Sequence, residues 1–106
     1  MTQVTLFLAL VAGHALGDFP LQGDFLARAK NHRAPIAGVD WWIALAAHAA
    51  IQGAIVGALT GSLVLACFEF VAHAIIDRCK CEGLIGFRSD QLLHLWCKAV
   101  CVYVLS

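Results

Sequence analysis

Charged residues are scarce in this sequence. Asp, Glu, Lys and Arg account for 13% of the 106 residues, against a usual share of about 25%. The formal net charge is zero, so the basic surface that nucleic-acid-binding proteins present to phosphates is missing. A soluble globular domain is disfavoured as well, because so few charged side chains would leave its surface largely apolar.

Two catalytic signatures are also missing from the sequence. There is no Gly-x-Ser-x-Gly motif, which places the nucleophilic serine of many hydrolases. There is no glycine-rich loop of the kind that binds nucleotide phosphates. The sequence therefore gives no support for serine-hydrolase or nucleotide-dependent chemistry.

Apolar residues, in contrast, are abundant. They make up 61% of the chain, and the mean hydropathy is +0.82. A chain with this composition buries too much apolar surface to stay disordered. Its length suffices for one domain, which we take as residues 1–106. We therefore expect a small integral membrane protein whose main partner is the lipid bilayer.

Four apolar stretches predict an all-α fold, a four-helix transmembrane bundle with short loops. The stretch from Trp41 to Asp77 has 37 residues, which as one helix would be about 55 Å long. A bilayer core is only about 30 Å thick, so this stretch has to fold back, and the turn is expected at Thr60-Gly61-Ser62. The predicted helices are residues 2–19, 41–59, 62–77 and 90–106.

The basic residues predict the orientation of such a bundle. With four spans, the loops 20–40 and 78–89 lie on one side, and together they carry six Lys or Arg residues. The opposite side, with both termini and the 60–62 turn, carries none. By the positive-inside rule the two loops are cytoplasmic and both termini are non-cytoplasmic. The expected location is the bacterial inner membrane, crossed several times.

A stripe of small residues runs along the second predicted helix. Ala49, Gly53, Gly57 and Gly61 recur every four residues, which allows a neighbouring backbone to approach closely. The partner is either the third helix of the same chain or a second copy. In the second case Gly53, Gly57 and Gly61 would form the interface of a homo-oligomer.

Ionisable side chains inside the predicted spans follow a helical spacing. They form three series with steps of four residues: His14-Asp18, Glu69-His73-Asp77 and Asp90-His94-Lys98. Residues four apart share one face of a helix. Ionisable groups are costly inside a membrane and usually face an interior functional site. We therefore expect these polar stripes to converge in one pocket near the cytoplasmic end.

The residue types in these stripes indicate a metal site. Imidazole and carboxylate groups are common ligands of zinc, iron and manganese, and four-helix bundles build metal sites from such side chains. The spacing Glu-x-x-x-His differs from the Glu-x-x-His of di-iron bundles. The predicted ligands of a divalent Zn, Fe or Mn ion are His14, Asp18, His48, Glu69, His73, Asp77 and His94. This set suffices for one ion and extends to two adjacent ions.

A structural interpretation stands beside the metal site. The same residues could form a buried hydrogen-bond and ion-pair network, in which Glu69 pairs with Lys98 at a similar depth. Intramembrane ionisable groups more often serve function than structure, which favours the metal site.

Hydrolysis is the reaction that such a site would favour if the protein is an enzyme. A bound metal lowers the pKa of a water molecule toward ~7 and thereby supplies hydroxide. Glu69 or Asp77 would then act as ligand or general base. Basic residues at the membrane edge could hold a phosphate or a lipid headgroup. The predicted substrate-binding residues are Gln22, Arg78, Lys80, Asp90 and Gln91.

Two other functions fit the same composition. The first is a subunit of a proton or metal-ion transporter or channel, which would need to oligomerise because the chain is so small. The second is a non-enzymatic membrane protein, such as a phage protein that binds a membrane partner, in which the polar cluster is structural.

Three motifs support a resemblance to a known family. They are His14-x-x-x-Asp18-Phe19-x-x-Gln22, His73-x-x-x-Asp77-x-x-Lys80 and Asp90-Gln91-x-x-His94. In this order they resemble small bacterial and phage membrane proteins grouped as domain of unknown function 3307. The resemblance covers most of the chain and implies the nine polar positions of these motifs, all named residues but Phe19, as signature residues, with no established activity. A looser similarity, by analogy only, links the chain to membrane-bound metal-dependent hydrolases.

Overall fold

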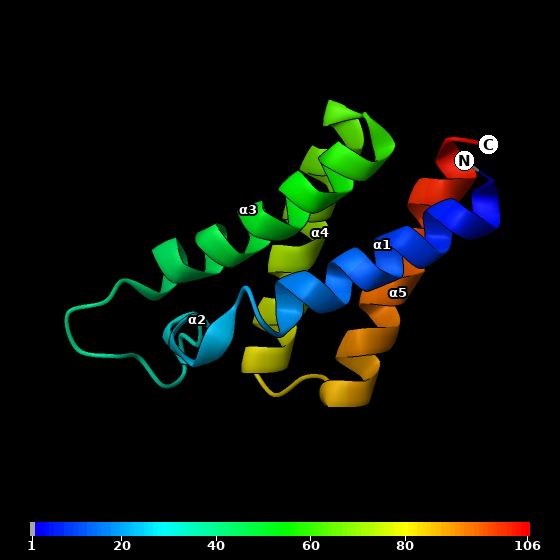
Figure 1. The fold of residues 1–106 in the computed structure, drawn as a ribbon. Helices are drawn as coiled ribbons and strands as arrows, with labels where there is room; N and C mark the ends of the chain where they lie inside the picture. Colours follow the sequence, from blue (N-terminus) through cyan, green and yellow to red (C-terminus); the bar gives the residue numbers. More distant parts are fainter. Residues whose placement is uncertain (1) are drawn as a thin grey trace.

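The structure, a computed structural model, describes residues 2–106. Over this range it contains five helices and no strands (Figure 1), so the all-α prediction is confirmed. The short second helix lies in a segment expected to be a loop, and the last helix begins at Phe87, ahead of the expected Asp90. The helices are α1 (Gln3–Asp18), α2 (Gly23–Ala29), α3 (Trp41–Thr60), α4 (Leu63–Cys81) and α5 (Phe87–Val104).

Local chemistry accounts for the turn between α3 and α4. Gly61 closes α3 with a φ of 70°, a left-handed conformation that glycine adopts without steric cost. Ser62 then caps α4, and its side chain accepts a hydrogen bond from the backbone N–H of Leu65 at 3.1 Å. Capping of this kind satisfies an otherwise unpaired N–H of the first helical turn. The chain therefore reverses direction where the sequence predicts.

The four long helices form a closed bundle. Helix α1 packs against α3 and α5, α4 packs against the same two helices, and α2 lies beside α3. Both chain ends lie together at the end of the bundle where α3 turns into α4 (Figure 1), and the Gln3 side chain donates a hydrogen bond to Ser106. Helix α2 and the α4–α5 connection lie at the opposite end. The side of a membrane on which each end lies stays a prediction.

The interior is rich in polar and charged side chains, which are seldom fully buried unless they are paired. Large apolar side chains cover the outside, and among them Leu63, Val64 and Tyr103 are 77–81% exposed. In residues 2–106, ten buried side chains are polar or charged and nine are apolar. The buried polar residues are His14, Lys30, His48, Gln52, Glu69, His73, Asp77, Asp90, His94 and Lys98.

Length and composition identify one helix that could cross a membrane by itself. Within residues 2–106 this is α3, and the pair α1 and α2, bent by 82°, meets the same criterion when taken together. The bundle of four spans and the multi-pass location predicted from the sequence therefore stay predictions.

The small-residue stripe of α3 faces α4 of the same chain. A Cβ atom on Gly53 would lie 2.9 Å from the backbone oxygen of Ala66, and one on Gly57 would lie 2.9 Å from the Ala66 Cβ. Gly61 instead forms the turn. Two of the three glycines expected at an oligomer interface thus have a partner within the chain. A homo-oligomer through this stripe stays a prediction.

Replacing Gly53 by alanine should destabilise the bundle. The new Cβ would be closer to the Ala66 backbone oxygen than real Cβ atoms come, so α3 and α4 must separate, at a cost of about 1–3 kcal/mol. The measurement is thermal unfolding of the purified chain in detergent. Gly86→Ala is the control, because a Cβ there meets no atom within 4 Å. Equal melting temperatures for the two variants would contradict the close contact of α3 with α4.

Candidate metal centre

Four side-chain atoms from three helices meet inside the bundle. We call them the four-atom cluster: Asp18 Oδ1 from α1, His48 Nε2 from α3, and His73 Nε2 and Asp77 Oδ2 from α4. The two histidine nitrogens are 2.9 Å apart. Asp18 Oδ1 is 3.2 Å from His48 Nε2 and 3.4 Å from His73 Nε2. Asp77 Oδ2 is 3.4 and 3.5 Å from the same two nitrogens.

Four of these five separations, at 3.2–3.5 Å, lie near the edge length of a tetrahedron around a metal ion, and the two histidine nitrogens at 2.9 Å lie closer together. Zinc binds histidine nitrogen and carboxylate oxygen at about 2.0–2.2 Å, so ligand atoms at the corners of a tetrahedron lie about 3.3–3.6 Å apart. The observed range is 2.9–3.5 Å. The donor set, two imidazoles and two carboxylates, is one that zinc, iron and manganese accept. The cluster therefore has the ligand chemistry of a metal site, and three of its residues, Asp18, His48 and His73, lie close enough together to hold an ion.

The His73 ring is oriented by Glu69. Its Nδ1 donates to the Glu69 carboxylate at 3.1 Å, which turns Nε2 toward His48 Nε2 and two carboxylate oxygens. Those two oxygens also accept hydrogen bonds from Lys30 and Gln52. A metal ion between the two ring nitrogens would compete with these donors.

A buried ion pair lies behind His73. Lys98 on α5 donates a hydrogen bond to Glu69, and neither residue is exposed. The Glu69–Lys98 pair expected from the sequence is thus formed. Glu69 contacts His73 on its Nδ1 side, so it is separated from the four-atom cluster by the imidazole ring. In metal sites, a carboxylate in this place orients the ligating histidine and raises its basicity.

The cluster is buried, so its two carboxylates need hydrogen-bond donors or positive charges close to them. His48 and His73 are fully buried, and the Asp77 side chain is 3% exposed. Isolated carboxylates are strongly disfavoured in such surroundings. Lys30 Nζ donates to Asp77 Oδ2 at 2.7 Å, and Gln52 Nε2 donates to Asp18 Oδ1 at 3.0 Å. The two carboxylates are therefore held in place by donors from α3 and from the segment that follows α2.

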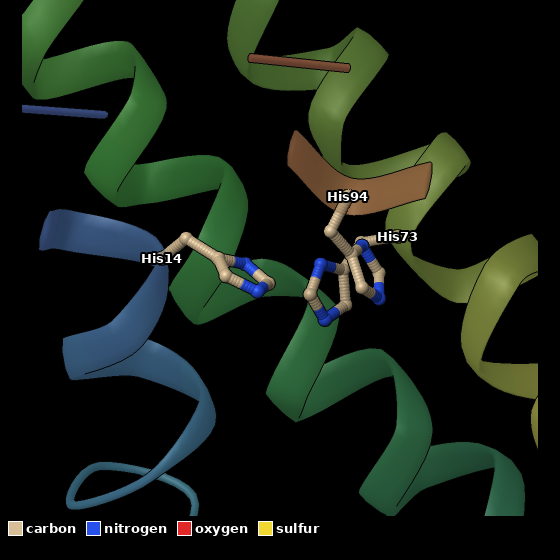
Figure 2. Close-up of side chains that lie close together, drawn as sticks. All are labelled: His14, His73 and His94. Atoms are coloured by element: carbon tan, nitrogen blue, oxygen red, sulfur yellow. The ribbon is translucent and has the colours of Figure 1, made fainter. Parts of the chain in front are cut away.

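Three more buried side chains, His14, His94 and Asp90, adjoin the cluster. His14 and His94 extend toward the cluster residue His73 from α1 and α5 (Figure 2), and each of the three histidines offers a ligand atom within 4.8 Å of the other two. Asp90 joins them on α5, with Oδ1 3.4 Å from His94 Nε2. The polar stripes predicted on separate helices thus converge in one place.

The predicted substrate-binding residues lie in three different places. Asp90 and Gln91 lie inside, where Gln91 Nε2 donates to Asp18 Oδ2 and to Asp90 Oδ2, both at 3.0 Å. Gln22 lies just beyond α1, and its side chain donates to the Asp18 backbone oxygen at 2.8 Å. Arg78 and Lys80 are exposed, and their charges lie over the rings of Trp41 and Phe87.

Aromatic rings hold both exposed cations at the bundle end. The Arg78 guanidinium lies 4.9 Å from the centroid of the Trp41 ring, and the Lys80 ammonium lies 5.2 Å from that of Phe87. Nearby, Glu82 accepts hydrogen bonds from His32 and Arg33. The hydrogen bond from His32 is the main reason that the pKa of Glu82 is lowered from its ordinary value. These contacts tie the α2–α3 and α4–α5 connections together.

Sequence reasoning missed two polar residues of the site. Gln52 lies one turn after His48, and its side chain donates to the His14 backbone oxygen at 3.2 Å as well as to Asp18. A glutamine inside an apolar stretch, four residues from a histidine, was the available signal. Lys30 gave no such signal, because only the fold brings the segment after α2 over Asp77.

Comparison with known protein families shows which family the chain belongs to. The family described as "Protein of unknown function (DUF3307)" matches residues 6–106. The chain belongs to the DUF3307 family. The match includes every residue of the four-atom cluster, and the family expected from the three motifs is confirmed, whereas its description as bacterial and phage membrane proteins stays a prediction. No curated protein and no solved structure matches the chain. Since the DUF3307 description states no activity, the function has to be argued from the site.

Proposed function

We propose that the protein is a membrane-embedded metalloprotein that binds a divalent transition-metal ion at the four-atom cluster. The observation that carries this proposal is the convergence of four donor atoms at separations of 2.9–3.5 Å. Three of the four residues, Asp18, His48 and His73, each offer a ligand atom within 4.8 Å of the other two. The buried His/Asp groups can hold a metal ion, and Zn, Fe and Mn suit this donor set.

The surface of the bundle supports a membrane location. Apolar side chains such as Leu8, Val64 and Trp96 are 60–77% exposed, whereas the ionisable side chains near the middle of the long helices, among them His48, Glu69 and Lys98, are buried. Helices α3, α4 and α5 have 20, 19 and 18 residues. At 1.5 Å per residue they are about 27–30 Å long, close to the ~30 Å thickness of a bilayer core.

For the activity, we propose metal-assisted hydrolysis. A metal ion at such a site lowers the pKa of a bound water and supplies hydroxide near neutral pH. Of the two acids expected as general base, Asp77 lies in the cluster, whereas Glu69 lies behind His73 and is paired with Lys98. Asp77 is therefore placed as a ligand of the ion, and Glu69 as a residue that orients His73. His73, oriented by Glu69, and His48 would hold the ion.

Elemental analysis of the purified full-length chain tests the proposal. We expect at least one zinc, iron or manganese ion per chain, removed by a chelator and restored on reconstitution. His32→Ala is the matched control, since His32 lies at the bundle end on Glu82 and its loss should leave the metal content unchanged. A chain that holds no metal after reconstitution would overturn metal binding.

Activity assays then separate the proposed functions. Metal-dependent turnover of chromogenic carboxylic and phosphate esters supports hydrolysis. Metal-ion or proton flux in liposomes without turnover would instead support the transporter predicted as an alternative. If the metal-free chain retains its biological effect, the polar cluster is structural and the hydrolase proposal is wrong.

A further inference from the structure

We propose that a second divalent metal ion binds beside the first, held by His14, Asp90 and His94. In this dinuclear centre Asp18 and Asp77 would bridge the two ions, each with one carboxylate oxygen per ion. The inference rests on the proposed function, because it needs the first ion at the four-atom cluster. It adds a second binding position with its own ligands.

The donors of the second position are buried and close together. His94 Nε2 lies 3.3 Å from Asp77 Oδ1 and 3.4 Å from Asp90 Oδ1. Asp18, Asp90 and His94 each offer a ligand atom within 4.8 Å of the other two. His94 is fully buried, and Asp90 is 2% exposed. These separations again suit atoms that share one ion.

The carboxylates of Asp18 and Asp77 are turned so that each faces both positions. Asp18 Oδ1 contacts the first position, at 3.2 Å from His48 Nε2, while its Oδ2 lies 3.3 Å from His14 Nε2. Asp77 does the same, with Oδ2 toward the first position and Oδ1 toward His94. A carboxylate with its two oxygens on different donor groups has the geometry of a bridging ligand.

The two positions are close enough for a paired site. The rings of His73 and His94 are stacked, with centroids 4.1 Å apart, so ligands of the first and second positions are direct neighbours. Paired metal ions in hydrolytic enzymes are about 3.5–4 Å apart. Such pairs stabilise both the attacking and the leaving oxygen of a displacement, which agrees with the proposed hydrolysis.

Asp90 provides an independent observation that points to a ligand. Its Oδ1 is buried and has no hydrogen-bond partner among the described residues, although such atoms are nearly always paired. Oδ2 of the same carboxylate accepts from Gln91, which also holds Asp18. Gln91 thereby fixes the two carboxylates side by side, and Oδ1 is left aimed at His94.

His14 completes the second position. Its Nε2 lies 3.1 Å from Gln91 Oε1 and 3.3 Å from Asp18 Oδ2. Without metal, a proton on Nε2 is shared with these oxygens. An ion at this position would replace that proton, as metals do when they bind histidine.

Charge balance fits two ions. The carboxylates of Asp18, Asp77 and Asp90 and one hydroxide carry four negative charges, which two divalent ions neutralise. Lys30 donates to Asp77 Oδ2, the oxygen that faces the first position, so binding of the first ion would compete with that contact. Lys98 stays neutralised by Glu69.

Metal titration of the chelator-treated full-length chain in detergent tests this inference. With Zn²⁺ we expect two ions per chain by calorimetry and elemental analysis. With Mn²⁺ we expect an exchange-coupled electron paramagnetic resonance spectrum at two equivalents. Asp90→Asn and His94→Gln should each lower the stoichiometry from two to one and remove the coupling. His32→Ala should keep both ions.

The outcomes separate this inference from the proposed function. Two coupled ions in the unaltered chain support the dinuclear centre without the use of any variant. One ion per chain with an uncoupled spectrum overturns the second position but leaves the first. No ion at all overturns both. Two ions that persist in folded Asp90→Asn and His94→Gln, judged by circular dichroism, would also overturn the proposed ligands.

Discussion

Replacement of His73 by alanine should abolish high-affinity metal binding. His73 Nε2 has three of the five short contacts within the four-atom cluster, to His48 at 2.9 Å, Asp18 at 3.4 Å and Asp77 at 3.5 Å. Removal of an orienting neighbour of a metal ligand typically costs 10–100-fold in affinity, so loss of the ligand itself should cost more than about 100-fold. Competition with a chelator of known affinity measures the change.

Glu69→Gln provides the graded comparison for His73→Ala. Glutamine keeps an oxygen that can accept from His73 Nδ1 but loses the negative charge, so metal affinity should fall by about 10–100-fold and not vanish. Metal-dependent turnover should fall less in Glu69→Gln than in His73→Ala. If His73→Ala binds metal as tightly as the unaltered chain while circular dichroism shows a folded bundle, the metal centre is misassigned.

Lys98→Met should be strongly destabilising. Lys98 and Glu69 are both fully buried and paired, and removal of one partner leaves an uncompensated charge in a medium of low dielectric constant. Breaking a buried pair in this way costs about 3–5 kcal/mol. Denaturant unfolding of the purified chain in detergent, without metal, measures the loss. Lys80→Met is the matched control, because Lys80 is exposed.

The double variant Glu69→Gln with Lys98→Met should recover most of the lost stability. A buried ion pair replaced by neutral groups of similar volume is often neutral or stabilising. The coupling energy between the two positions is obtained from the four unfolding free energies. If Lys98→Met is no less stable than Lys80→Met, the pair is not buried and ionised as described.

The periodicity of the sequence was sufficient to predict that the fold is all-α and which faces of the helices are polar. Steps of four residues identified the stripes on α1, α4 and α5, because side chains four apart overlie one another on a helix. Glycine and serine at 61–62 predicted the turn, and the structure shows the capping contacts that make it.

Other features depend on tertiary structure and were beyond the sequence. Helix α2 follows Pro20 in a polar segment without apolar periodicity. Glu69 is separated from the cluster because it bonds to Nδ1 of His73, whereas the cluster contains Nε2 of the same ring. Arg78 and Lys80 follow the last ligand of α4, but the rings of Trp41 and Phe87 decide where their charges lie.

The order in which the helices supply the four-atom cluster has a consequence for biogenesis. The four atoms come from α1, α3 and α4, and α5 contributes none of them. A nascent chain on the ribosome lacks a complete set of these ligands until Asp77 has emerged, whereas the last helix is not required. Metal capture during synthesis would thus tie the first helices together before the final segment is released.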